Sequence, residues 1–182
     1  MTDPGNECDS GGIDYRDMFD LGEFLEHFDR IRQRSRRVAV CIPDDRLEWR
    51  LKPNGFSLGD LVRHIAVTER YMWAETVFNR ESRYVSHGAE LAATRDAAVA
   101  LLDRLHAEAM AIFRTLTPEA LAGKCRTPEG TAVTTWKWLR AMAEHEIHHR
   151  GQIYLMLNVL DVPTPPLYGL TSEEVRSRSK PL

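Results

Sequence analysis

The chain has 182 residues, a formal net charge of −3, seven histidines and three cysteines. This length suits one domain, or one domain with tails, and such a chain buries about 70% of its unfolded surface, so folding requires neither disulfides nor a metal. The slightly acidic balance argues against a protein that binds nucleic acid through charge. Cys8, Cys41 and Cys125 form no CxxC pair, which favours a reducing cytosol with unpaired thiols.

The N-terminal residues contain no basic region followed by an apolar run, so no secretory signal is predicted. The longest uninterrupted apolar run, Val38 to Ile42, is far shorter than the roughly 20 residues that a membrane-spanning helix needs. We therefore expect a cytoplasmic protein with no membrane partner.

Residues 1–14 combine proline and glycines with acidic residues, and they predict a flexible lead. From about Tyr15, apolar residues recur at three and four residues as far as Pro43, which predicts the first helix. We expect its outer face to be either solvated or a docking surface for an anionic ligand or partner. That face carries a run of arginines: Arg30, Arg32, Arg34, Arg36 and Arg37.

Three more helices are predicted. The second begins at Ser57, which forms a capping-box-like pair with Asp60, and extends to about Asn79. The third covers about 90–116, and residues 118–132 form a connection that has room for one helical turn. The fourth, about 133–160, has the strongest pattern, because one face carries a continuous seam. The seam consists of Trp138, Met142, His145, His149, Gln152, Met156 and Leu160.

Four helices without a convincing strand predict an all-α fold, a four-helix bundle over residues 15–162. A Pro-rich tail occupies 163–182, with Tyr168 and Leu170 able to pack back on the bundle. The short connection at 80–88 favours antiparallel neighbours, whereas longer connections allow crossovers, so the helix order stays open.

His145 and His149 occupy consecutive seam positions, so both imidazoles can reach one point, as histidines at i and i+4 commonly do around a divalent metal. His64, near the inward face of the second helix, is the best candidate for a third ligand. Buried nitrogens without partners cost about 1 to 3 kcal/mol each, and one metal would satisfy all three. The alternative is that these are core histidines hydrogen-bonded to backbone or water.

Three neutral nitrogen ligands leave open coordination positions, which is typical of a catalytic or substrate-binding metal rather than a closed structural zinc site. Side chains near the ligands would orient the imidazoles, and the candidates are Asp60, Thr68 and Gln152.

Other residues near the seam are expected to have lesser roles. His148 should face away from the seam and is expected to support the site from outside or to lie at an interface. Arg150 would bind an anionic substrate or form a surface salt bridge. His27, His87 and His106 are expected to be ordinary surface residues.

Residues 145–152, His-Glu-Ile-His-His-Arg-Gly-Gln, preceded by Trp136-Lys-Trp138, resemble the signature of the DinB/YfiT-like superfamily of metal-dependent bacterial proteins. Residues 57–64, Ser-Leu-Gly-Asp-Leu-Val-Arg-His, are similar to the segment that carries that family's upstream histidine. Residues 165–170, Pro-Pro-Leu-Tyr-Gly-Leu, resemble the segment after the last helix in many members.

The resemblance implies a bundle in up-down-down-up order, a divalent metal such as zinc or nickel held by His64, His145 and His149, and frequent homodimers. In that order the second and third helices are parallel, so the connection between them must run back along the bundle nearly extended. Relatives include S-transferases that use low-molecular-weight thiols, a mycothiol-dependent isomerase and members named as hydrolases.

We therefore expect a metal-dependent enzyme that acts on a small molecule, as a thiol S-transferase with an external low-molecular-weight thiol or as a hydrolase. Two alternatives remain: a metal-binding stress protein without turnover, and a helical interaction module with structural histidines. A three-histidine site should lose its metal as pH falls through about 6.5, the ordinary pKa of histidine.

Overall fold

A computed structural model describes residues 20–84 and 86–180, so the predicted lead at 1–14 lies outside the described residues. Most of the described chain is helical. The elements are α1 (Leu21–Ala39), η1 (Asp44–Arg46), α2 (Leu58–Thr68), η2 (Glu69–Trp73), α3 (Ala74–Thr76), α4 (Arg95–Phe113), α5 (Pro118–Ala122), β1 (Lys124–Arg126), β2 (Ala132–Thr134), α6 (Thr135–Val159) and α7 (Ser172–Arg178).

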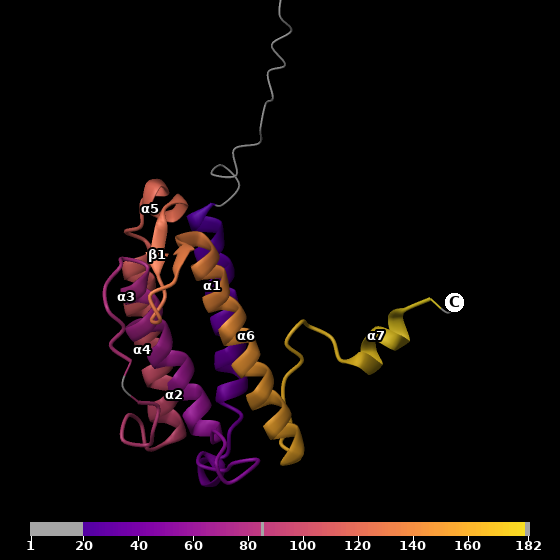
Figure 1. The fold of residues 1–182 in the computed structure, drawn as a ribbon. Helices are drawn as coiled ribbons and strands as arrows, with labels where there is room; N and C mark the ends of the chain where they lie inside the picture. Colours follow the sequence, from indigo (N-terminus) through magenta and orange to yellow (C-terminus); the bar gives the residue numbers. More distant parts are fainter. Residues whose placement is uncertain (1–19, 85, 181–182) are drawn as a thin grey trace, which may run out of the picture.

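The long helices form a four-helix bundle in the expected up-down-down-up order (Figure 1). α1 and α6 run in one direction, and α2 and α4 run side by side in the other. Because α2 and α4 are parallel, the chain between Thr76 and Arg95 has to return along the outside of the bundle before α4 begins. This crossover segment brings loop residues next to α2.

Side chains cap the helix starts. Asp20 accepts a hydrogen bond from the Glu23 backbone at the start of α1, and Ser57 and Asp60 form the predicted capping box of α2. Thr94 caps α4. Each cap satisfies a backbone N–H that lacks a helical partner.

Two apolar clusters fill the bundle, one toward each end. On α6 the first cluster stops at Ala143 and the second begins at Ile153. On the α2 side the break falls between Val67 and Trp73. A layer of buried polar side chains lies at this break: Arg32, Glu69, His106 and Glu146.

Two residues of this polar layer, Arg32 and His106, are buried where the sequence predicted surface positions. Arg32 was expected on the outer face of the first helix, and His106 was expected to be a surface residue; both are buried, at 1% and 7% exposure. Arg32 forms ion pairs with Glu69 and with Glu146, the latter at 3.0 Å. Nδ1 of His106 lies 2.8 Å from Glu69. Four ionisable residues, one each from α1, η2, α4 and α6, thus meet in the core. Burial raises the pKa of Glu146, although the neighbouring Arg32 guanidinium acts to lower it.

Two segments differ from the predicted elements. The predicted second helix changes at Glu69 into a π-helical turn, η2, and ends with α3 at Thr76, short of Asn79. The π turn buries both Glu69 and Trp73. π turns of this kind are frequent near functional sites. The connection at 118–132 contains α5 and part of a two-stranded antiparallel ladder, in which Cys125 pairs with Val133. Such short strands carry too little alternation to be predicted from the sequence.

The C-terminal segment, residues 163–180, leaves the bundle beside α6 and ends in α7, which projects outward (Figure 1). We call it the arm. Tyr168 packs back on the bundle only in part: it is 76% exposed, but the guanidinium of Arg34 lies 5.2 Å from its ring centre and Nη2 of Arg150 donates to its hydroxyl at 3.5 Å. No described helix is both long and apolar enough to cross a membrane.

Candidate metal centre

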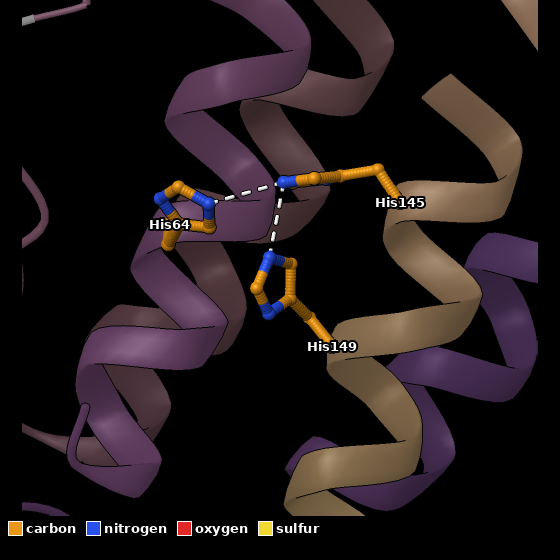
Figure 2. Close-up of side chains that lie close together, drawn as sticks. All are labelled: His64, His145 and His149. Atoms are coloured by element: carbon orange, nitrogen blue, oxygen red, sulfur yellow. Dashed lines mark hydrogen bonds between the residues drawn. The ribbon is translucent and has the colours of Figure 1, made fainter. Parts of the chain in front are cut away.

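Three histidines from two antiparallel helices meet at the polar layer (Figure 2). His64 extends from α2, and His145 and His149 extend from successive turns of α6. The Nε2 atom of His145 lies 3.1 Å from Nε2 of His64 and 3.0 Å from Nε2 of His149. The i, i+4 spacing predicted the approach of the α6 pair, and the antiparallel packing of α2 against α6 brings in His64.

The opposite nitrogens of two of these rings have their own partners. Nδ1 of His149 lies 2.7 Å from Oε1 of Gln152, an oxygen that only accepts hydrogen bonds, so Nδ1 carries the proton. Nδ1 of His64 lies 3.1 Å from the Tyr84 hydroxyl, which in turn lies 2.6 Å from Nδ1 of His87. A hydroxyl that donates to His87 accepts from His64. Both Nε2 atoms then direct lone pairs toward His145.

The three imidazoles are held neutral by their surroundings. Burial lowers the pKa of His64 to about 4 and that of His145 to about 3, and neighbouring histidines lower both further. Burial also lowers the pKa of His149, although the hydrogen bond that its Nδ1 donates to Gln152 acts in the opposite direction. Neutral imidazoles are the form that binds metals. The three histidines therefore stay able to bind a cation at pH values well below the ordinary histidine pKa.

The residues present fit a divalent metal. Zinc–nitrogen bonds of the usual length place tetrahedral ligands about 3.3 Å apart, close to the Nε2 separations found here. Without a cation, lone pairs at this distance repel unless a proton lies between them. The donor set is all nitrogen, and in the described part of the chain no carboxylate or thiol joins the group. Three protein ligands leave coordination positions open.

Aromatic rings surround the cluster. The Trp73 ring packs on His145 with centres 4.7 Å apart, and Phe56 lies 5.2 Å from the His64 ring and 4.6 Å from the His87 ring. These apolar walls lower the local polarity, which strengthens any electrostatic interaction inside.

The sequence analysis missed two residues of the site. Tyr84 was not considered, and His87 was expected to be an ordinary surface residue. Both lie on the crossover segment and are half-buried against His64. A loop has no periodicity from which this contact could be predicted. The one available signal was the helix order, because parallel second and third helices require the connection between them to run back along the bundle.

Of the remaining candidates, Gln152 and His148 lie next to the three histidines, whereas Asp60 has other partners. Oε1 of Gln152 accepts a hydrogen bond from Nδ1 of His149, and exposed His148 contacts Gln152 through Nε2 at 3.2 Å. Asp60 instead accepts from Ser57 and pairs with Arg50 and Arg63, so it is not the partner of His64.

Thr68 and Arg150 also differ from expectation. The Thr68 hydroxyl donates to the backbone oxygen of His64 rather than to its ring. Arg150 is buried at 3% exposure and faces α1, where Nη1 donates to the Ile31 carbonyl at 3.3 Å. Arg150 therefore forms neither a surface salt bridge nor a contact with the three histidines among the described interactions.

An antiparallel arrangement of α2 and α6 with three inward histidines defines a helical-bundle protein with a candidate metal centre. The sequence matches the profile of the DinB superfamily over residues 27–153, and the chain belongs to this superfamily.

Solved structures share the fold. A DinB-like protein of Bacillus subtilis, YjoA, is 22% identical with a TM-score of 0.62, over 82% of this chain and 99% of that one. YfiT of Bacillus subtilis, described as a "probable metal-dependent hydrolase" with a four-helix bundle, is 17% identical with a TM-score of 0.63, over 79% and 89%. A mycothiol-dependent maleylpyruvate isomerase is 17% identical with a TM-score of 0.61, over 76% and 62%. No curated protein matches the sequence.

Proposed function

We propose that this protein is a metal-dependent enzyme that holds a divalent ion, zinc or nickel, on His64, His145 and His149. The observation that carries the proposal is the convergence of three Nε2 atoms, two of them turned inward by hydrogen bonds to Tyr84 and Gln152. Imidazole sites take zinc or nickel readily, and preference between them depends on geometry and supply.

A bound divalent ion would supply Lewis acidity, which activates water or a small thiol at neutral pH. The protein's own residues prepare the place for it. Tyr84 and Gln152 hydrogen-bond two of the imidazoles, and the rings of Phe56 and Trp73 pack against His64 and His145. Open ligand positions would face a small-molecule substrate.

Two reaction types fit this site. In S-transfer, an external low-molecular-weight thiol loses its proton and its sulfur bonds to an electrophilic carbon, while the leaving group departs with the bonding electrons. In hydrolysis, the oxygen of water bonds to an acyl carbon and the leaving group takes a proton. The solved structure described as a probable metal-dependent hydrolase supports the second type, and the mycothiol-dependent isomerase supports the use of an external thiol in this fold.

The thiol in the first reaction type would have to come from outside the chain. The free cysteines of the described residues are Cys41, just after the end of α1, and buried Cys125, in the β ladder. Neither belongs to the histidine group. Unpaired cysteines also fit our inference of a reducing cytoplasm.

The first experiment is metal analysis of protein purified without a histidine tag, followed by zinc and nickel titration. We expect one ion per chain, and loss of at least 100-fold in affinity in His64→Ala, His145→Ala and His149→Ala. His27→Ala, on an exposed position of α1, is the matched control and should bind as the wild type does. Metal retained by all three variants would contradict the site and favour a helical interaction module.

The second experiment measures turnover with a panel of thiols and electrophiles and with generic esters and amides. We expect a product that requires the metal and is lost in His145→Ala. A protein that binds the ion and forms no product with any pair would instead be a metal-binding protein without turnover.

A further inference from the structure

A groove lies beside the candidate metal centre, between the second half of α6 and the loop of residues 51–56. Its volume is about 550 Å³, which is in the range of pockets that bind small molecules. Two residues of its wall also contact the histidines. Gln152 accepts from Nδ1 of His149, and the Phe56 ring lies 5.2 Å from the His64 ring and 6.2 Å from the His149 ring. One end of the groove is therefore next to the three histidines.

Apolar side chains form most of the groove wall. Leu61 and Met156 are buried, whereas Leu51 and Leu155 are 57% and 56% exposed. Large apolar side chains that face water on both sides of one groove are unfavourable, and an apolar ligand that covers them removes this cost. The groove therefore favours a molecule with an apolar body.

Lys52 gives the groove a positive charge. Among the described residues, no carboxylate lines the groove and none pairs with the Lys52 ammonium. The neighbouring cation, Arg50, already pairs with Asp60 at 2.7 Å. The groove therefore carries one unmatched positive charge, which is complementary to a ligand with one anionic group.

Hydrogen bonds fix the loop that carries Lys52. The N–H of Gly55 donates to the Lys52 carbonyl at 3.0 Å, and Nη1 of Arg50 donates to the Gly55 carbonyl at 2.7 Å. A Cβ at Gly55 would lie 3.1 Å from Cγ of Lys52, so glycine leaves room for the lysine side chain to lie across the loop. The folded loop thus sets the position from which Lys52 reaches the groove.

We propose that this groove binds the part of the substrate that does not react, an apolar chain or ring that ends in one anionic group. The anionic group lies at Lys52, the apolar body covers Leu155 and Met156, and the reacting group lies beyond Phe56 at the three histidines. From His149 to Met156 α6 rises by about 10 Å, which sets the length of the apolar body. This inference rests on the proposed function and specifies its substrate class.

In the S-transfer reaction the groove is assigned to the electrophile. A small hydrophilic thiol would leave the exposed side chains Leu51 and Leu155 in water and would gain little from the apolar wall. An electrophile or an ester with an apolar body covers them. The groove therefore selects the same substrate class in both reaction types.

The first test is an NMR titration of the methyl-labelled full chain with octanoate, an apolar chain with one carboxylate. We expect shifts at the methyl groups of Leu155 and Met156. We expect none at Ile147 and Leu170, which line a separate groove of about 600 Å³ between α6 and the arm. The shifts should persist after a chelator removes any metal, because the contacts are the protein's own. Shifts only at the arm groove, only in metal-loaded protein or nowhere would overturn the proposal.

The second test compares octanoate, octanol and octylammonium, which share one apolar chain. The wild type should bind octanoate about three- to fivefold more tightly than octanol, the strength of an exposed ion pair, and octylammonium most weakly. Lys52→Glu should reverse this order. The matched control is Lys137→Glu, at an exposed position near the start of α6, which should keep the wild-type order. An order that Lys52→Glu leaves unchanged would show that Lys52 does not bind the anion.

The third test changes the apolar wall. Leu155→Gln should weaken the binding of octanoate and of octanol alike by roughly three- to tenfold, because both lose the same apolar contact. Val159→Gln, one turn further along α6, is the matched control: Val159 is similarly exposed, at 52%, and lies outside the groove. Its affinities should equal those of the wild type. An unchanged affinity in Leu155→Gln would contradict an apolar body at this position.

The fourth test measures substrate preference in the hydrolytic reaction. Monomethyl suberate carries an ester at one end of an apolar chain and a carboxylate at the other. Its kcat/KM should exceed that of dimethyl suberate, which lacks the anion, and that of monomethyl succinate, which lacks most of the apolar body. Equal values for the three esters would overturn the substrate class.

This inference and the proposed function fail separately. Zinc binding by a wild-type protein that shows no octanoate shifts would overturn the groove alone. Octanoate shifts in a wild-type protein that binds neither zinc nor nickel would overturn the metal centre alone.

Discussion

The Tyr84 hydroxyl lies 3.1 Å from Nδ1 of His64, on the side of the ring opposite His145. Burial raises the pKa of Tyr84, with Asp60 adding to the effect, so the hydroxyl keeps its proton and can donate to His87 while it accepts from His64. A residue of the crossover segment thereby fixes the tautomer of a proposed metal ligand on α2.

Tyr84→Phe should weaken zinc binding by roughly 10- to 100-fold, because loss of the partner that orients a ligand histidine has that effect in other sites. Competition titration with a chromophoric chelator measures the change. Tyr71→Phe, a tyrosine outside the histidine group, is the control and should bind as the wild type does. Equal affinities in wild type and Tyr84→Phe would mean that Tyr84 does not orient His64.

Gln152 offers a test in both directions. Gln152→Glu places a carboxylate against Nδ1–H of His149. The carboxylate makes Nε2 of the same ring a stronger electron-pair donor to the metal, so zinc affinity should rise. Gln152→Leu removes the acceptor and should lower affinity by roughly tenfold or more. Calorimetric titration of both variants gives the comparison. The prediction fails if the two changes have the same sign.

The buried ion network should matter for stability. Arg32→Leu leaves Glu69 and Glu146 facing each other in the core without their cation, so we expect a loss of about 3–5 kcal/mol in the free energy of unfolding. Arg30→Leu breaks an exposed pair with Glu26, at 3.8 Å, and should cost less than about 1 kcal/mol. Urea denaturation measures both.

A compensated variant separates charge from packing. Adding Glu69→Gln and Glu146→Gln to Arg32→Leu removes the stranded charges, so part of the lost stability should return. If the triple variant is less stable than Arg32→Leu alone, the two carboxylates are not destabilised by each other in the single variant.

Acid should destabilise the metal-free fold through the histidine group. The folded-state pKa values of His64 and His145, about 4 and about 3, lie below the ordinary 6.5. Between those values the unfolded chain binds more protons, so stability is present above pH 6.5 and falls as pH drops toward 4. Denaturation of His145→Gln should show a shallower pH dependence than the wild type over this range.

The same shifts revise the expected pH limit of metal binding. Protons compete with the ion only as pH approaches the lowered pKa values, so metal retained at about pH 5.5 agrees with a three-histidine site. Equilibrium dialysis from about pH 4 to about pH 7 measures retention. Release that is complete by about pH 6 would show that the ligands have ordinary histidine pKa values.

Patterns of residues three and four apart in the sequence determined the helices and the faces that they bury. The Ser57 and Asp60 capping box and the seam that carries His145 and His149 arise from helical geometry, which relates residues three and four apart. The sequence by itself therefore predicted the helices, the bundle and the inward placement of the α6 histidine pair.

Only the tertiary structure decided which distant residues meet those histidines. Arg32 and His106 have the sequence context of surface residues, yet each finds a buried carboxylate across the bundle. Tyr84 and His87 reach His64 because parallel packing of α2 and α4 draws the crossover segment along the bundle. Such contacts depend on how whole helices are arranged, and no periodicity within one segment encodes them.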